Sequence, residues 1–122
     1  MDRQKIMNDA AETLSRYVQF DTTNPPGNEM HAALWLADQI AAREITFDIA
    51  VHEPVADRGL VVARIAGTEP LKPLLINHHI DVVAADATQW THPPFSGEIA
   101  GGFVWGRGTL DTKGLGVMFL LA

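Results

Sequence analysis

The sequence predicts an α/β protein with a three-layer arrangement, in which helices cover both faces of a sheet of mixed strand direction. The first third of the chain has apolar residues at helical spacing, and the middle third has the short alternating or apolar runs of strands. The last residues are again helical. Segments in this order are typical of an α/β sheet packed between helices.

Two helices are expected before the first strand. Residues 3–19 carry one apolar stripe, and Asp2 is placed to cap that helix. Asn24-Pro25-Pro26-Gly27 ends this region, because proline lacks an N–H and restricts the residue before it. The second helix is expected to run from Asn28, as its cap, to about residue 43. The residues expected to face the core are Ala33, Leu36, Ala37 and Ile40.

Three strands are expected next. Residues 46–52 alternate between apolar and polar, residues 59–66 are more apolar and more central, and Leu74 begins a third strand. That third run is apolar on both faces, as in a strand at the middle of a covered sheet. A long proline-containing connection, residues 84–100, then leads to a short strand at residues 103–105 and a helix near Lys113.

Composition narrows the possible functions. The 122 residues are 47% hydrophobic and 20% charged, which fits one globular domain. A net charge of −6 without a Lys/Arg cluster longer than two argues against binding to nucleic acid or to an anionic membrane. The absence of cysteine excludes disulfides and thiolate sites. Because the first residues lack the pattern of a signal peptide, a soluble cytoplasmic protein is expected.

The C-terminal residues 116–122 form an apolar helix that stops without a capping residue. We therefore expect the chain to be truncated within a larger domain. The alternative is a short C-terminal helix that docks in a groove.

The first chemical motif lies in Asn77-His78-His79-Ile80-Asp81. Residues two apart in an extended segment share a face, so His79 and Asp81 point together, and His78 is expected to pack on the other side. A neutral imidazole is a zinc ligand, and a neighbouring carboxylate can fix its tautomer. A structural hydrogen-bonded pair is the alternative.

The second motif surrounds Asp111 in a glycine-rich segment, residues 106–114. A carboxylate on such a turn can bridge two metal ions about 3.5–4 Å apart. It can also simply cap the helix that follows. Arg107 and Lys113 would be charges near the site or, equally, surface-exposed bases. His31 and His52 are expected to be solvated, and His92 to belong to an aromatic pocket wall.

Together these segments resemble the zinc-dependent amidohydrolases and exopeptidases that include acetylornithine deacetylase, succinyl-diaminopimelate desuccinylase, aminoacylase and carboxypeptidase S. Four motifs carry the resemblance, with His78 in place of a usual small residue and Ala84 in place of a usual proline. They are Asn24 to Glu29, Asn77 to Ala84, Trp90 to Phe95 and Gly106 to Gly114.

The resemblance implies roles for three residues. His79 would be a ligand of one zinc ion, Asp111 the carboxylate bridging two ions, and Asp81 the catalytic residue that orients His79. Cobalt or manganese would also suit such ligands. The family's Glu-Glu pair, which supplies the general base and another ligand, does not occur in the sequence.

Residues 1–122 would therefore be the amino-terminal part of a metallohydrolase catalytic domain, without the lid and dimerisation domain. The full-length parent, possibly a homodimer, would hydrolyse an amide or peptide bond in N-acyl amino acids or small peptides. This part is expected to be inactive alone. The alternative is a non-catalytic α/β binding module that keeps the fold.

Overall fold

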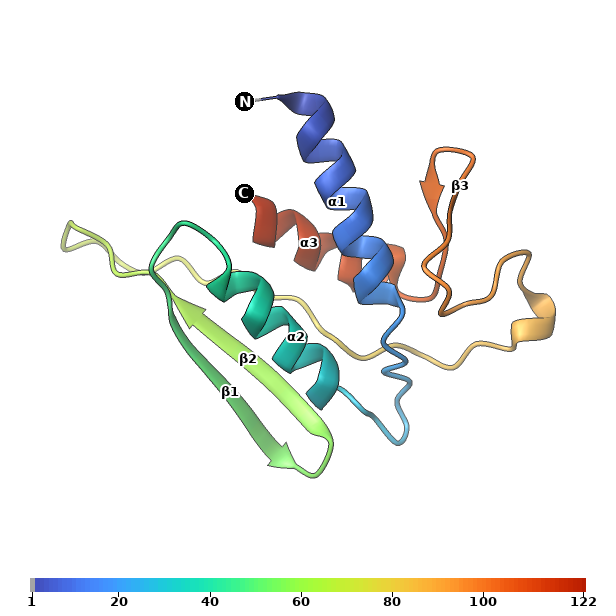
Figure 1. Ribbon diagram of the computed structural model, residues 1–122. Coiled ribbons are helices and arrows are strands. Elements are labelled where there is room, and N and C mark those ends of the chain that lie inside the picture. The colour runs from blue at the N-terminus through green and yellow to red at the C-terminus, as the bar shows by residue number, and fades with distance from the viewer. Residues whose placement is uncertain (1) are drawn as a thin grey trace.

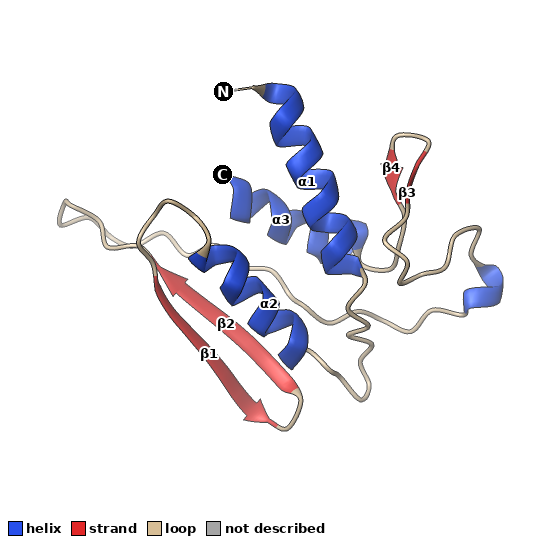
Figure 2. Ribbon diagram, viewed as in Figure 1, coloured by secondary structure: helices blue, strands red, loops and turns tan. Residues whose placement is uncertain are grey.

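The computed structural model describes residues 2–122. It contains three α-helices, α1 (Arg3–Val18), α2 (Met30–Ala41) and α3 (Gly114–Leu121), and two antiparallel strand pairs. The pairs are β1 (Asp48–Val55) with β2 (Arg58–Arg64), and β3 (Ile99–Ala100) with β4 (Phe103–Val104) (Figure 2). A 3₁₀ turn, Ala87–Gln89, and a wide turn, Thr109–Lys113, lie in the connections. These elements agree with the α/β class, whereas the three-layer arrangement stays a prediction.

The N-terminal helix forms as its sequence predicts. The side chain of Asp2 accepts a hydrogen bond from the Gln4 amide, which satisfies one of the unpaired N–H groups of the first turn. The predicted cap of the second helix is wrong. That helix begins after Glu29 rather than Asn28, and its cap makes no side-chain hydrogen bond. The Glu29 carboxylate instead pairs with Arg58 of β2 at 2.6 Å.

The β1–β2 hairpin packs one face against α2 (Figure 1). The register pairs Ile49 with Ala63 and Val51 with Val61, so the alternation of β1 places Ile49 and Val51 on the half-buried face. Gly59 lies where a side chain would meet Met30 and Ala33 of the helix, which allows close approach of strand and helix.

The main buried cluster joins the helices rather than the faces of a large sheet. Helix α1 lies beside α3, and α2 contributes from the side of the hairpin (Figure 1). The buried members of this cluster are Tyr17, Ala32, Leu36 and Val117.

The predicted third strand at Leu74 is wrong for the described structure. Residues 71–81 are extended but pair with no strand among residues 2–122, and Leu74 and Leu75 are 88% and 85% exposed. A strand is defined by ladder hydrogen bonds to a neighbour. Here an apolar groove separates the segment from β2, so its backbone groups have no ladder partner. Only at its end does one parallel bridge form, between Thr23 and Val82.

Candidate metal centre

The loop after α1 fixes the end of the extended segment that carries the first motif. The Asn24 amide donates to the Val82 carbonyl at 2.9 Å, and the Val82 amide donates to the Thr22 carbonyl at 3.1 Å. The Thr22 hydroxyl donates to the Ile80 carbonyl at 2.8 Å. These bonds hold the backbone on both sides of Asp81.

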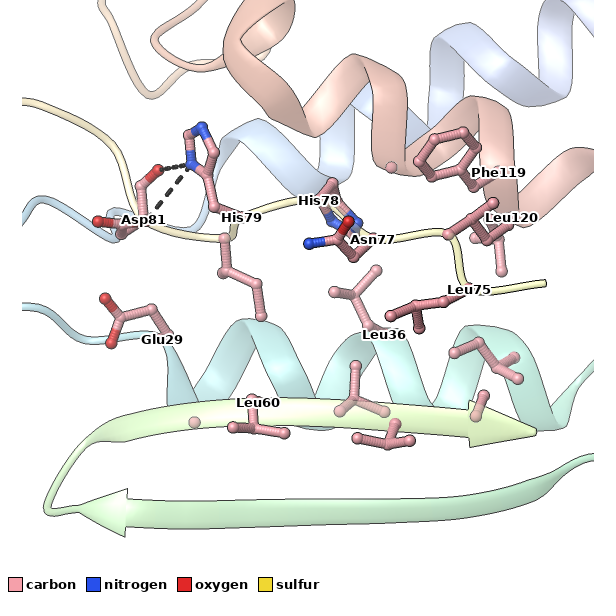
Figure 3. A pocket seen from close by; sticks show the side chains of 18 of the residues that line it. Glu29, Leu36, Leu60, Leu75, Asn77, His78, His79, Asp81, Phe119 and Leu120 are labelled. Carbon is pink, nitrogen blue, oxygen red and sulfur yellow. Dashed lines mark hydrogen bonds and ion pairs between the residues drawn. The ribbon is translucent and has the colours of Figure 1, made fainter. Parts of the chain in front are cut away.

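His79 lies between two carboxylate residues. Its Nδ1 is 2.9 Å from the Asp81 carbonyl oxygen and 3.3 Å from Asp81 Oδ1, and its Nε2 is 3.1 Å from Asp111 Oδ1. Figure 3 shows the imidazole and the Asp81 side chain together. Because a carbonyl oxygen only accepts, Nδ1 carries a proton, and in the neutral ring the lone pair is then on Nε2. That nitrogen is the one directed toward Asp111.

The environment changes the pKa of His79. Partial burial alone would lower this pKa. The hydrogen bonds to the Asp81 carbonyl and the Asp111 carboxylate, together with the negative charges of both residues, raise it above its ordinary value. The two carboxylates therefore favour a positive charge at His79, and a bound cation would meet the same favourable field.

Asp111 is brought to His79 by the wide turn that precedes α3. Gly108 begins this turn with a left-handed backbone, and a side chain there would meet Val82. Asp111 and Thr112 then leave helical backbone angles, so the Asp111 carboxylate projects from an extended segment instead of capping α3. No capping hydrogen bond from a side chain is present at that helix, which makes the capping alternative wrong.

Thr112 connects the two motifs directly. Its hydroxyl oxygen accepts from the His79 amide at 3.2 Å and donates to the His79 carbonyl at 3.1 Å. The interpretation of the sequence missed this residue, because a threonine beside a glycine-rich turn has many local uses. It also missed Asn24, whose side-chain amide donates to Asp81 Oδ2 at 2.9 Å. The position of Asn24 in the Asn-Pro-Pro-Gly motif was the available signal.

His78 faces away from this centre. Its Nε2 lies 3.0 Å from the Tyr17 hydroxyl, and its ring packs where a side chain on Gly116 would stand. Burial, followed by the neighbouring charge of His79, lowers the pKa of His78. Neighbouring histidines thus have different partners, and only His79 contacts the two aspartates.

Lys113 is fully buried, so its interpretation as a surface-exposed base is wrong. Its ammonium group donates to the Phe20 carbonyl at 2.8 Å and to the Tyr17 carbonyl at 3.4 Å, and it lies 5.1 Å from the centre of the Tyr17 ring. Burial lowers the pKa of Lys113 to about 8, against the opposing effect of Asp21. The residue ties the turn that carries Asp111 to the C-terminal end of α1, where carbonyl oxygens lack helical partners.

The other predicted candidates lie outside the centre. His31 and His52 are exposed, as expected of solvated residues. His92 pairs with Glu98 at 2.8 Å and stacks on Trp105, with ring centres 4.4 Å apart. It belongs to an aromatic cluster but does not reach His79.

The geometry fits two ligands of one metal ion. Zinc holds nitrogen and oxygen ligands at about 2.0–2.2 Å, so two tetrahedral ligand atoms lie roughly 3.3 Å apart. The observed separation of His79 Nε2 and Asp111 Oδ1 is 3.1 Å. Among residues 2–122, however, no three His, Cys, Asp or Glu side chains gather as a metal-binding group. The described residues therefore bring together two candidate ligands, fewer than the three protein ligands of a catalytic zinc site. They also include no helix long and apolar enough to cross a membrane.

Comparison with known proteins points to one family. The model of peptidase family M20/M25/M40 matches residues 75–122, which include both motifs. A succinyl-diaminopimelate desuccinylase of Paracoccus denitrificans is 35% identical over 106 residues, which cover 86% of this chain and 26% of that protein. Aminoacylase-1 of Sus scrofa is 31% identical over 109 residues, 88% of this chain and 26% of that protein.

A shorter match is more similar. A probable carboxypeptidase S-like protein of Dictyostelium discoideum is 57% identical over 47 residues, 38% of this chain and 9% of that protein. The chain thus spans about a quarter or less of the length of these relatives. With the matched motifs and the resemblance seen in the sequence, these relationships show that the chain belongs to peptidase family M20/M25/M40.

Proposed function

We propose that the protein carrying this chain hydrolyses the amide bond of N-acyl amino acids or small peptides in a metal-dependent reaction. The observation that carries the proposal is the convergence of His79 Nε2 and Asp111 Oδ1, 3.1 Å apart, beside Asp81. The relatives named as a desuccinylase, an aminoacylase and a carboxypeptidase-like protein support amide hydrolysis as the reaction class.

His79 and Asp111 would hold the metal, with zinc as the first choice and cobalt or manganese as alternatives for the same ligand types. A bound ion of this kind polarises a carbonyl and lowers the pKa of water toward 7. Asp81 is a positioning residue: its carbonyl accepts from His79 Nδ1, which leaves Nε2 unprotonated toward the ion. Asn24 fixes the Asp81 carboxylate in turn.

Two protein ligands are fewer than the three of a catalytic zinc site, so residues 2–122 are expected to bind zinc only modestly and to lack hydrolytic activity by themselves. The discriminating observation is the dependence of binding on His79. A non-catalytic module that merely keeps the fold would bind zinc, if at all, without regard to this residue.

Isothermal titration of the untagged chain with zinc tests the proposal. His79→Ala and Asp111→Ala should each weaken binding at least about tenfold. His31→Ala is the matched control, since it removes an exposed histidine from α2 and should leave binding unchanged. Equal zinc affinity in wild type and His79→Ala would contradict the site. In the longer protein, hydrolysis of N-acyl amino acids should be lost with a chelator and return with zinc.

A further inference from the structure

Arg107 lies in the same cavity as the candidate metal ligands His79 and Asp111. A cavity of about 460 Å³ is lined by both motifs and by the aromatic loop between them. The lining residues that matter here are Asn24, His79, Asp81, Trp90, Arg107 and Asp111. The cavity therefore brings one guanidinium group into the same space as the candidate metal ligands.

Arg107 is held in place at this wall. Its amide donates to the Pro94 carbonyl at 2.7 Å, and its guanidinium carbon lies 5.0 Å from the centre of the Trp90 ring. A planar guanidinium that stacks on an indole keeps its edge free for hydrogen bonds. The side chain is thus supported from the backbone and from one face.

The charge of Arg107 has no carboxylate partner among residues 2–122. The two aspartates of the cavity are bound elsewhere, because Asp81 contacts Asn24 and His79, and Asp111 contacts His79. Arg107 Nε is buried without a hydrogen-bond partner. The positive charge at this wall of the cavity therefore lacks a compensating anion among the described residues.

We propose that Arg107, stacked on Trp90, binds a carboxylate of the substrate and so favours acylated amino acids that carry a free carboxylate over their neutral amides. This inference rests on the proposed function and adds a residue that determines specificity. A carboxylate matches the fork of the guanidinium group and would compensate its charge. The substrate would then place its amide toward His79 and its carboxylate at Arg107.

The test measures anion binding without metal. Wild-type chain in a chelating buffer is titrated by NMR with N-acetylglycine and with its neutral analogue N-acetylglycinamide. N-acetylglycine should bind at least about tenfold more tightly, as expected for a charge-assisted hydrogen-bonded pair. N-succinylglycinamide carries the carboxylate on the acyl side, so comparing the two acids shows which end of the substrate Arg107 binds.

Arg107→Gln should abolish the preference for acid over amide. Arg16→Gln is the matched control, because Arg16 also stacks on an aromatic ring, that of Phe20 at 5.5 Å, but lies on α1 away from the cavity. Equal binding of acid and amide by wild type, or an unchanged preference in Arg107→Gln, would overturn the inference and leave Arg107 as a structural brace.

A direct signal covers the case in which Arg107→Gln does not fold. The Nε–H resonance of Arg107 in the wild-type chain should shift with either acid and stay in place with the amide. A resonance that ignores both acids overturns the inference. Because the chelator removes metal, a negative result in this experiment overturns only the role of Arg107. The metal site is tested separately by the dependence of zinc binding on His79.

Discussion

The extended segment between residues 75 and 83 borders two cavities of different character, and His79 and Asp81 line both of them. Toward β2 and α2 lies the apolar groove of about 560 Å³, lined by side chains such as Leu36, Leu60 and Leu75 (Figure 3). Toward the glycine-rich turn lies the polar cavity of about 460 Å³ with His79, Asp81 and Asp111. The groove is bordered by large exposed apolar side chains. In the polar cavity, hydrogen bonds join Asn24 to Asp81 and His79 to Asp111.

The difference shows what holds each region. Hydrogen bonds donated by Thr22, Asn24 and Thr112 hold the polar cavity at the end of the segment. The start of the segment has no ladder partner among residues 2–122, and its apolar side chains face the groove. Substitutions on the polar side should therefore change stability strongly, and those at the rim of the groove should change it little.

The largest effect is expected for Lys113. Lys113→Ala removes a buried side chain and leaves the Tyr17 and Phe20 carbonyls without their donor, which should lower the free energy of unfolding by about 2–4 kcal/mol. Urea unfolding followed by circular dichroism measures the loss. Lys5→Ala is the control, since Lys5 is exposed on α1 and should change stability by less than about 0.5 kcal/mol. A Lys113→Ala value as small as that of the control would show that the turn does not depend on this anchor.

A smaller effect is expected where the His78 ring packs on α3. Gly116→Ala places a methyl group where the His78 ring packs, and this overpacking should cost about 1–3 kcal/mol despite the better helix propensity of alanine. Thermal unfolding provides the comparison. Gly67→Ala, at a position with open space around it, should be close to neutral. Equal melting temperatures for the two variants would argue against the packing of His78 on α3.

The buried hydroxyl of Tyr17, which contacts the same His78 ring, predicts an alkaline transition. Burial raises the pKa of Tyr17 above the ordinary value of 10, so the folded chain keeps this proton after the unfolded chain has lost it. The contribution of Tyr17 to the free energy of unfolding is complete below pH 10. Above pH 10 the free energy of unfolding falls by about 1.4 kcal/mol per pH unit.

Tyr17→Phe keeps the ring but cannot ionise. The difference in unfolding free energy between wild type and Tyr17→Phe cancels the titration of other groups. Above pH 10 the wild type should lose stability relative to the variant. Denaturant unfolding between pH 8 and 11 measures it. A difference that stays constant over this range would show that the hydroxyl is accessible to solvent.

The smallest effect is expected in the groove. Leu75→Ser changes a side chain that is 85% exposed, so the unfolding free energy should move by less than about 0.5 kcal/mol. The same variant should bind less of an apolar fluorescent dye than wild type, because the rim of the groove loses a large apolar group. A loss of stability comparable to that of Lys113→Ala would mean that the segment packs more tightly than its exposure indicates.

Local patterns predicted the helices and the first two strands well. The apolar stripe and the Asp2 cap identified α1, and alternation identified β1, because these signals lie within one element. The third strand was predicted wrongly. A run that is apolar on both faces indicates burial between layers, but the pattern does not show whether a neighbouring strand is present for it to pair with. The prediction of Asn28 as the cap failed for a similar reason. Glu29 occupies the cap position, and its side chain pairs with Arg58 from a distant strand instead of bonding to the helix.

Strand parity gave the opposite orientations of His78 and His79, and the structure adds the contact between His79 and Asp111 across 32 positions. The sequence did not reveal which side chains would support this contact. Thr112 and Lys113 act through backbone groups that lie far away in sequence, and such contacts leave no periodic signal. The metal roles of His79 and Asp111 and the orienting role of Asp81 stay predictions until zinc binding is measured.

The double hydrogen bond between Thr112 and the backbone of His79 also makes the assembly of the two motifs observable at a single nucleus. The amide proton of His79 is donated to a side chain 33 positions later, so it can exchange with solvent deuterium only when that side chain moves away. The exchange rate of this one proton therefore reports the free energy with which the glycine-rich turn closes on the histidine, before any metal or substrate is added.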